Sequence, residues 1–170
     1  MYLHHELELS YNCSLEKVLR IIKTHSAAVT QVKDSKTPAE VVLTDPHFNA
    51  AFVRTVICAL LDADSTSCST QFSTGNWTVH EVLQTKEPDE HILLALLHHD
   101  PQLVHHISKK TGQSVLHLSC MHEQPPLEFI TQVLTLTLTL TLILILILTL
   151  TLTLTLTLTL TLTLTLTLTL

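Results

Sequence analysis

Residues 114–120 read SVLHLSC, and after a polar break they are followed by the apolar run PPLEFITQVL at 125–134. Three earlier stretches share this arrangement: MYLHHEL at 1–7, KTPAEVVL at 36–43 and NWTVHEVL at 76–83. Each of these is also followed by a stronger apolar run, namely SLEKVLRII, NAAFVRTVICALL and DEHILLALL. An order of anchor points that recurs at nearly constant spacing is the signature of a repeat protein. The sequence therefore predicts about four stacked structural units.

Each unit is predicted to contain two helices. The apolar residues of LEKVLRII follow the i, i+3, i+4, i+7 spacing of an amphipathic helix, and Phe52, Val56 and Leu60 repeat this pattern in the second unit. Asn49 and Asp89 stand where the second helices of two units should begin, as residue types that cap helices. One such pair of helices cannot bury both of its faces alone, so stability must come from neighbouring units. We therefore expect an all-α solenoid.

The pattern resembles the ankyrin repeat, whose first helix begins Thr-Pro-Leu-His-x-Ala within a unit of ~33 residues. Thr37 and Pro38 match the first half of this signature, and Leu116 and His117 match its second half. The resemblance covers residues 1–134 and implies a divergent array of about four units, the last of them incomplete. In the family the Thr caps the first helix, the Pro occupies its first turn, and the Leu packs into the shared core.

The family's histidine bonds backbone groups and holds neighbouring units in register. His4 and His80 align with His117, so the resemblance implies this role for all three. The second unit has Glu40 at this position, and it is the unit in which we expect departures from regular geometry. By resemblance, loops should project sideways near residues 31–37, 69–76 and 106–113.

The segment from Leu134 onward contains only Leu, Thr and a short block of Ile. A period of two places all Leu on one face of a strand, and Thr forms strands better than helices, so propensity favours β structure. However, strands are usually ~3–10 residues long, and no turn residue would let this segment fold back. We therefore expect residues 135–170 to be a low-complexity tail without a stable globular fold.

Two further interpretations of this tail stay open. Residues 134–170 are uncharged and long enough for one C-terminal membrane span of ~20 residues, although flanking Lys, Arg and aromatic anchors are absent. Alternatively, CTA-ACC repeats, the complement of the telomeric hexamer TTAGGG, encode Leu-Thr, and a change of ACC to ATC gives Ile. On that hypothesis a truncated gene fragment reads into repeat DNA, and its product has no independent function.

Catalytic and metal-binding chemistry has little support in the sequence. The twelve histidines are densest at His98-His99 and His105-His106, without the spacing of zinc ligands, and we expect these side chains to face solvent. The chain contains no nucleophile elbow, Walker A loop or GxGxxG motif. We therefore predict a protein that is not an enzyme and that uses no metal and no cofactor.

The remaining features concern partners and location. A net charge of −6 gives no basic footprint for nucleic acid. The N-terminus lacks a secretory pattern, so we expect cytoplasmic localisation, or a membrane location through the tail, with unused sequons at Asn12 and Asn76. The resemblance implies a protein-protein interaction module whose concave face binds an unknown partner. Trp77 would either contact that partner or pack at a repeat junction.

Overall fold

The computed structural model describes residues 2–8, 14–68 and 71–169. It divides into two compact units, Met1–Val133 and Leu134–Leu170. We refer to them as the helix-pair region and the Leu-Thr tail. The residues described contain helices and three isolated β-bridges but no β-strand, so the chain is all-α. The predicted boundary at 134/135 lies beside the division between the units.

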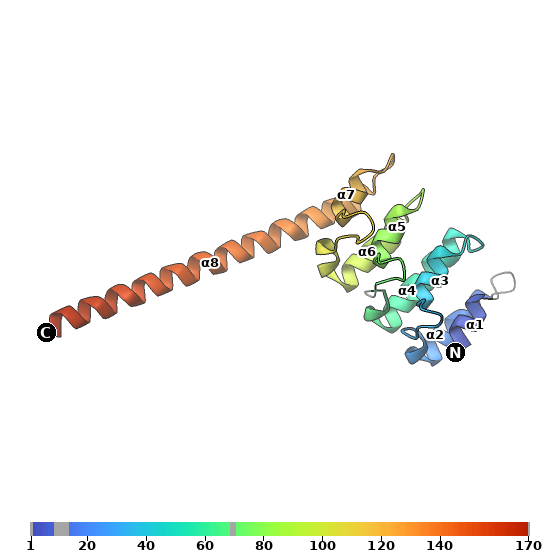
Figure 1. The fold of residues 1–170 in the computed structure, drawn as a ribbon, viewed down its shortest axis with the longest axis horizontal. Helices are drawn as coiled ribbons and strands as arrows, with labels where there is room; N and C mark the ends of the chain where they lie inside the picture. The colour runs from blue at the N-terminus through green and yellow to red at the C-terminus, as the bar shows by residue number, and fades with distance from the viewer. Residues whose placement is uncertain (1, 9–13, 69–70, 170) are drawn as a thin grey trace. The chain divides into compact units, whose positions relative to one another are not determined.

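The helices of the helix-pair region form two layers (Figure 1). The first layer contains α1 (Tyr2–Glu8), α3 (Pro38–Thr44), α5 (Thr78–Gln84) and α7 (Val115–Cys120). The second layer contains α2 (Leu15–Thr24), α4 (Ala50–Ala63), α6 (Glu90–His99) and the start of α8 (Leu127–Thr169). The 3-10 turns η2 (Ser26–Ala28), η3 (Ser65–Cys68) and η4 (Pro101–His105) follow α2, α4 and α6. Consecutive first-layer helices contact one another, as do α2, α4 and α6, so the helix pairs stack.

The core lies between the two layers and consists of aliphatic side chains from both. Val79 and Val115 of the first layer and Val56, Leu60 and Leu93 of the second are completely buried. Full burial of one such side chain contributes ~1.5–3 kcal/mol to folding. Since each pair shares its core with its neighbours, stacking supplies the burial that a single pair lacks.

Several helices begin at the residues that the sequence indicated. The Thr37 hydroxyl accepts a hydrogen bond from the backbone N–H of Glu40 at 3.2 Å, and Pro38 occupies the first turn of α3. The side chains of Asn49 and Asp89 accept hydrogen bonds from backbone N–H groups in the first turns of α4 and α6. These bonds satisfy donors that a helix N-terminus leaves unpaired.

Three hairpins connect consecutive pairs, at the places where the resemblance predicted projecting loops. They are closed by the bridges Lys33↔Lys36 (hairpin 1), Gln71↔Trp77 (hairpin 2) and Ile107↔Ser114 (hairpin 3). Gly75 and Gly112 have φ values of 82° and 70° at the turns of hairpins 2 and 3, a region that glycine enters without strain. The second pair, in which departures from regular geometry were expected, keeps both of its helices, α3 and α4.

The described residues of the Leu-Thr tail form a helix, which is part of α8. The β structure predicted from residue propensity is therefore wrong. An isolated strand has no partner for its backbone N–H and C=O groups, whereas a helix pairs each of them four residues away. Threonine hydroxyls add bonds to carbonyls three or four residues earlier, as Thr151 does to Leu148 at 2.9 Å. The tail nevertheless has no core of its own, since leucines such as Leu144 are 67% exposed.

Candidate interaction surface

Two residues at the predicted register position link a first-layer helix to a segment between pairs. His4, only 2% exposed, donates from Nε2 to the backbone carbonyl of Gln31 at 2.7 Å. This bond ties α1 to the segment that leads into hairpin 1, which is the role that the resemblance implies. Glu40 occupies the equivalent place in α3 and is 1% exposed. Its carboxylate accepts the backbone N–H of Ser73 at 3.2 Å and also the Ser73 hydroxyl, so α3 is tied to hairpin 2.

The Glu40 link ties the second pair to the hairpin that follows it, although this pair lacks the histidine. A carboxylate accepts hydrogen bonds where the histidine donates one, and Ser73 supplies the matching donors. The sequence did not predict this pairing, because Glu40 stood out only as a position that lacks the histidine and not as a hydrogen-bond acceptor. The signal that could have found it is a Ser or Thr in the following hairpin.

His80 is completely buried in α5, and neither ring nitrogen has a hydrogen-bond partner among the described residues. Burial lowers the pKa of His80, and the neighbouring His106 lowers it further. Backbone groups of Gln113 and His106 lie near the ring and oppose this pKa shift without reaching hydrogen-bond geometry. Burial also lowers the pKa of His106, whereas Asp100 raises it. His80 therefore lies at the predicted position, but the backbone hydrogen bonds expected of it are absent among the described residues, so that expectation needs correcting.

Trp77 lies at a junction between pairs. Its indole is half-buried and stacks on the imidazole of His106, with ring centroids 4.0 Å apart and planes inclined by 25°. Of the two roles that the sequence left open, this contact favours packing at the junction over contact with a partner. The stack places His106 beside the His80 site, so hairpin 3 is closely associated with α5.

His117 does not hold neighbouring pairs in register, so that expectation needs correcting. Its ring is exposed, and Nδ1 bonds the hydroxyl of Ser114 at the N-terminus of the same helix, at 2.7 Å. The chain passes from α7 into α8, and no later hairpin in the described residues offers a backbone partner. His122 instead links the pairs, because its Nε2 bonds the backbone carbonyl of Leu83 in α5. Leu116 of the same signature is half-buried in α7.

Hairpins 2 and 3 are bonded to each other directly. Asn76 is completely buried, donates to the Glu81 carboxylate at 2.9 Å and accepts from the Ser108 hydroxyl at 2.6 Å. The Lys109 ammonium donates to the side-chain carbonyl of Gln71 at 2.8 Å. These bonds join residues that are far apart in the sequence and fix the hairpins side by side. A buried Asn76 amide also leaves no access for a sugar in the folded protein.

The second layer has links of its own. The Arg54 guanidinium of α4 donates to Asp89, the cap of α6, at 2.7 Å. Glu90 of α6 accepts the backbone N–H groups of Glu128 and Phe129 at 2.9 and 3.2 Å. A side chain of one pair therefore caps the first turn of α8 in the next pair. Such contacts favour one register of stacking over its alternatives.

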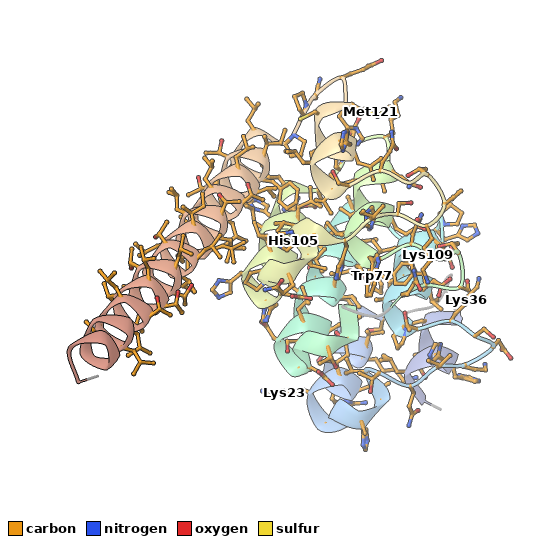
Figure 2. The ribbon with its side chains drawn as sticks, turned by 60° about the vertical axis from the view of Figure 1, so that its left-hand side comes forward. Lys23, Lys36, Trp77, His105, Lys109 and Met121 are labelled. Carbon is orange, nitrogen blue, oxygen red and sulfur yellow. The ribbon has the colours of Figure 1, made fainter. Side chains whose placement is uncertain are left out.

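The exposed side of the hairpins is rich in lysine. Lys36, Lys109 and Lys110 are exposed there, and Figure 2 shows Lys36 and Lys109 on the same side as Trp77, away from Lys23. An open hollow of about 360 Å³ lies beside hairpin 1, lined among others by His4 and Lys36. We call the outer surface of hairpins 1 to 3 the hairpin face.

The histidines that were expected to face solvent do so only in part. His98 and His105 are exposed, whereas His99 and His106 are half-buried because each packs within the fold. In the part of the chain that the structure describes, no group of three or more His, Cys, Asp or Glu side chains could hold a metal ion. The rings of His98 and His99 meet edge to face at 5.7 Å, and His98 is exposed. No protein-family model matches this chain, and neither a curated protein nor a solved structure shows significant similarity to it. The functional conclusion therefore depends on the residues and contacts described above.

Proposed function

We propose that the helix-pair region is a non-catalytic protein-binding module of the ankyrin type. The observation that carries this proposal is that side chains fix the hairpins in place. Glu40 of α3 bonds Ser73 of hairpin 2, and Asn76 of hairpin 2 bonds Ser108 of hairpin 3. These links hold a continuous surface in place before any partner arrives. A pre-ordered surface binds more tightly because less conformational entropy is lost on association.

The binding surface would consist of the hairpin face and the exposed sides of the first-layer helices. Thr44, Gln84 and Thr111 lie on these elements with exposed side chains. Stacked repeats present such extended surfaces and recognise partners by complementarity of shape and charge. The mechanism needs no catalytic group.

Selection of displayed random peptides against the full-length protein in mild detergent tests this proposal. Selected peptides would be crosslinked to variants that carry a photoreactive residue at Gln84 or Thr111, with Thr55 and His91 of the second layer as control positions. We expect crosslinks at the first two positions and none at the controls. Crosslinks confined to the controls, or no enrichment over the urea-unfolded protein, would contradict the proposal.

A second candidate function concerns the tail, which would tether the helix-pair region to a membrane from the cytoplasmic side. Leu127–Leu162 is a helix long and apolar enough to cross a membrane, by length and composition. The observation in favour is that threonine hydroxyls such as those of Thr151 and Thr157 bond the helix's own carbonyls. This bonding lowers the penalty for moving a hydroxyl into hydrocarbon.

Flotation of the full-length protein with membranes after carbonate treatment tests the tether. We expect the protein to float with lipid, whereas aggregates sediment. The variant Leu144→Lys/Leu148→Lys should lose flotation, because each charge at the centre of a span costs about 2.5–3.5 kcal/mol. Flotation of this variant equal to that of the original chain would contradict a transmembrane tail.

A further inference from the structure

Charge is unevenly distributed over the helix-pair region. The three hairpins carry Lys33, Lys36, Lys109 and Lys110, and their one carboxylate is Asp34. The whole chain nevertheless has a net charge of −6. The hairpin face is thus a basic strip on an acidic protein.

Carboxylates next to this strip are engaged in links within the fold. Glu40 is buried against Ser73, and Glu81 accepts hydrogen bonds from Thr74 and Asn76 at 2.9 Å. Asp45 lines the hollow beside hairpin 1 together with Lys33 and Lys36, and its carboxylate accepts the backbone N–H of His47 at 2.9 Å. All three carboxylates therefore have hydrogen-bond partners within the fold.

Lys109 is positioned without being neutralised. Its ammonium donates to the side-chain carbonyl of Gln71, which is uncharged, so the bond orders the side chain and leaves its positive charge uncompensated. Lys36 and Lys110 are exposed on hairpins 1 and 3, on either side of the uncharged hairpin 2. A partially ordered cation at the surface attracts carboxylates at a smaller entropic penalty than a free one.

We propose that the hairpin face binds an acidic, extended segment of a partner protein. This inference rests on the proposed function and adds the chemistry of the partner. Glutamate and aspartate side chains of the segment would pair with the lysines of hairpins 1 and 3, while its backbone passes over hairpin 2. Such a pairing is steered by charge and weakens as salt is added.

A protein segment is favoured over nucleic acid. Nucleic-acid binding depends on neutralising many phosphates along a continuous basic track, and an acidic protein repels the rest of the polyanion. With a net charge of −6, most of this chain disfavours a long polyanion, whereas the hairpin strip carries four lysines against one carboxylate. A short acidic peptide can lie within that strip, whereas a long polyanion would extend beyond it.

The test is fluorescence anisotropy with the full-length protein in neutral detergent. The probes are labelled oligo-glutamate and oligo-lysine peptides of about ten residues and a single-stranded oligonucleotide of about ten nucleotides. We expect the oligo-glutamate peptide to bind and the oligo-lysine peptide not to bind. The affinity for the oligo-glutamate peptide should fall by about tenfold or more between roughly 20 and 200 mM salt, because the electrostatic screening length shortens.

Two variants of equal charge change locate the binding. K36E/K110E reverses two exposed lysines of the hairpin face, whereas K23E/K86E reverses two exposed lysines elsewhere on the helix-pair region. The first should weaken oligo-glutamate binding by about tenfold or more, and the second by about twofold or less. Matching circular-dichroism melts would show that both variants are folded.

Each contrary result has a separate meaning. Equal losses in the two variants, or oligonucleotide binding as tight as that of oligo-glutamate, would overturn the acidic-segment proposal. Selected peptides that crosslink to Thr111 but are not acidic, and that bind unchanged to K36E/K110E, would overturn it while leaving the proposed function intact. Absence of any peptide at the hairpin face would overturn both.

Discussion

The helix-pair region and the Leu-Thr tail are both helical, but different interactions hold their helices. In the helix-pair region, short helices depend on links between pairs, such as Glu40 to Ser73 and His4 to Gln31. In the tail, one long helix is held by its own backbone and by hydroxyls bonded to carbonyls of the same helix. The comparison teaches that a unique packing arrangement requires positions that differ from one another. A two-residue repeat distributes Leu around the whole helix and distinguishes no face.

Removing the tail should have the largest effect. We expect a chain ending at Val133 to be soluble and monodisperse without detergent, because the tail exposes leucines such as Leu144, at 67%. The full-length chain should aggregate under the same conditions or associate with lipid. Size-exclusion chromatography measures this difference, and far-ultraviolet circular dichroism controls for helix content. A truncated chain that still aggregates would show that the surface causing aggregation lies on the helix-pair region.

Among the links between pairs, replacing Glu40 should be the most damaging single change. Glu40→Ala removes the acceptor for the backbone N–H and hydroxyl of Ser73, and we expect a loss of about 2–4 kcal/mol. Glu40→Gln keeps one acceptor and should lose less. Urea unfolding measures the change, with the exposed Glu87→Ala as a control that should stay within about 0.5 kcal/mol. A Glu40→Ala variant as stable as the control would mean that the link contributes nothing.

The bond between hairpins 2 and 3 should have a smaller, measurable effect. Asn76→Ala should cost about 1–3 kcal/mol, since it leaves the Ser108 hydroxyl buried without its acceptor. A double-mutant cycle with Ser108→Ala isolates this contact, and we expect a coupling energy of about 1 kcal/mol. Additive single-mutant effects would show that the two hairpins are held together by other contacts.

Acidification should loosen the same junction. Burial lowers the pKa values of His80 and His106 below the ordinary value of 6.5 in the folded state. Below pH 6.5 the unfolded chain therefore binds more protons than the folded one. The stability of the neutral rings is fully present above pH 6.5 and is lost as the pH falls toward the lowered pKa values.

Urea unfolding between about pH 7.5 and 5.5 measures this dependence, a range in which histidines titrate. His106→Phe keeps an aromatic ring against Trp77 but removes one titrating group, so the slope should flatten. His5→Gln changes an exposed histidine and should leave the slope unchanged. An unchanged slope in His106→Phe would exclude this residue as a source of the pH dependence.

The last prediction concerns the codons of the gene and not the stability of the protein. If the tail arose from telomere-like repeat DNA, the codons for residues 134–170 should be uniform CTA and ACC, with ATC in the Ile block. The codons of the helix-pair region should be mixed. Sequencing the locus and its transcript checks this, and varied Leu and Thr codons in the tail would exclude that origin.

Local sequence signals predicted much of the helix-pair region. The apolar spacing indicated the helices, and Thr37 and Asn49 marked two helix starts. Each of these features depends on residues within a few positions of one another. The all-α class and the position of the tail could therefore be predicted from the sequence.

The candidate surface was predicted less well, because its links join residues far apart in the chain. Nothing near Glu40 indicated Ser73 as its partner, and nothing near His122 indicated the carbonyl of Leu83. The resemblance assigned the linking role to His117, which instead bonds Ser114 of its own helix. Which side chain reaches the next pair depends on how the pairs stack.

The sequence by itself determined the helical pairs, their caps and turns, and the uniform composition of the tail. Only the tertiary structure decided that Glu40 replaces a histidine as a link, that Trp77 stacks on His106, and that the lysines of hairpins 1 and 3 share one face. The reason is physical, since local backbone preferences act over one or two turns of helix. The register of the helix pairs, the burial of side chains between them and the gathering of charges on one face arise only when distant segments pack together.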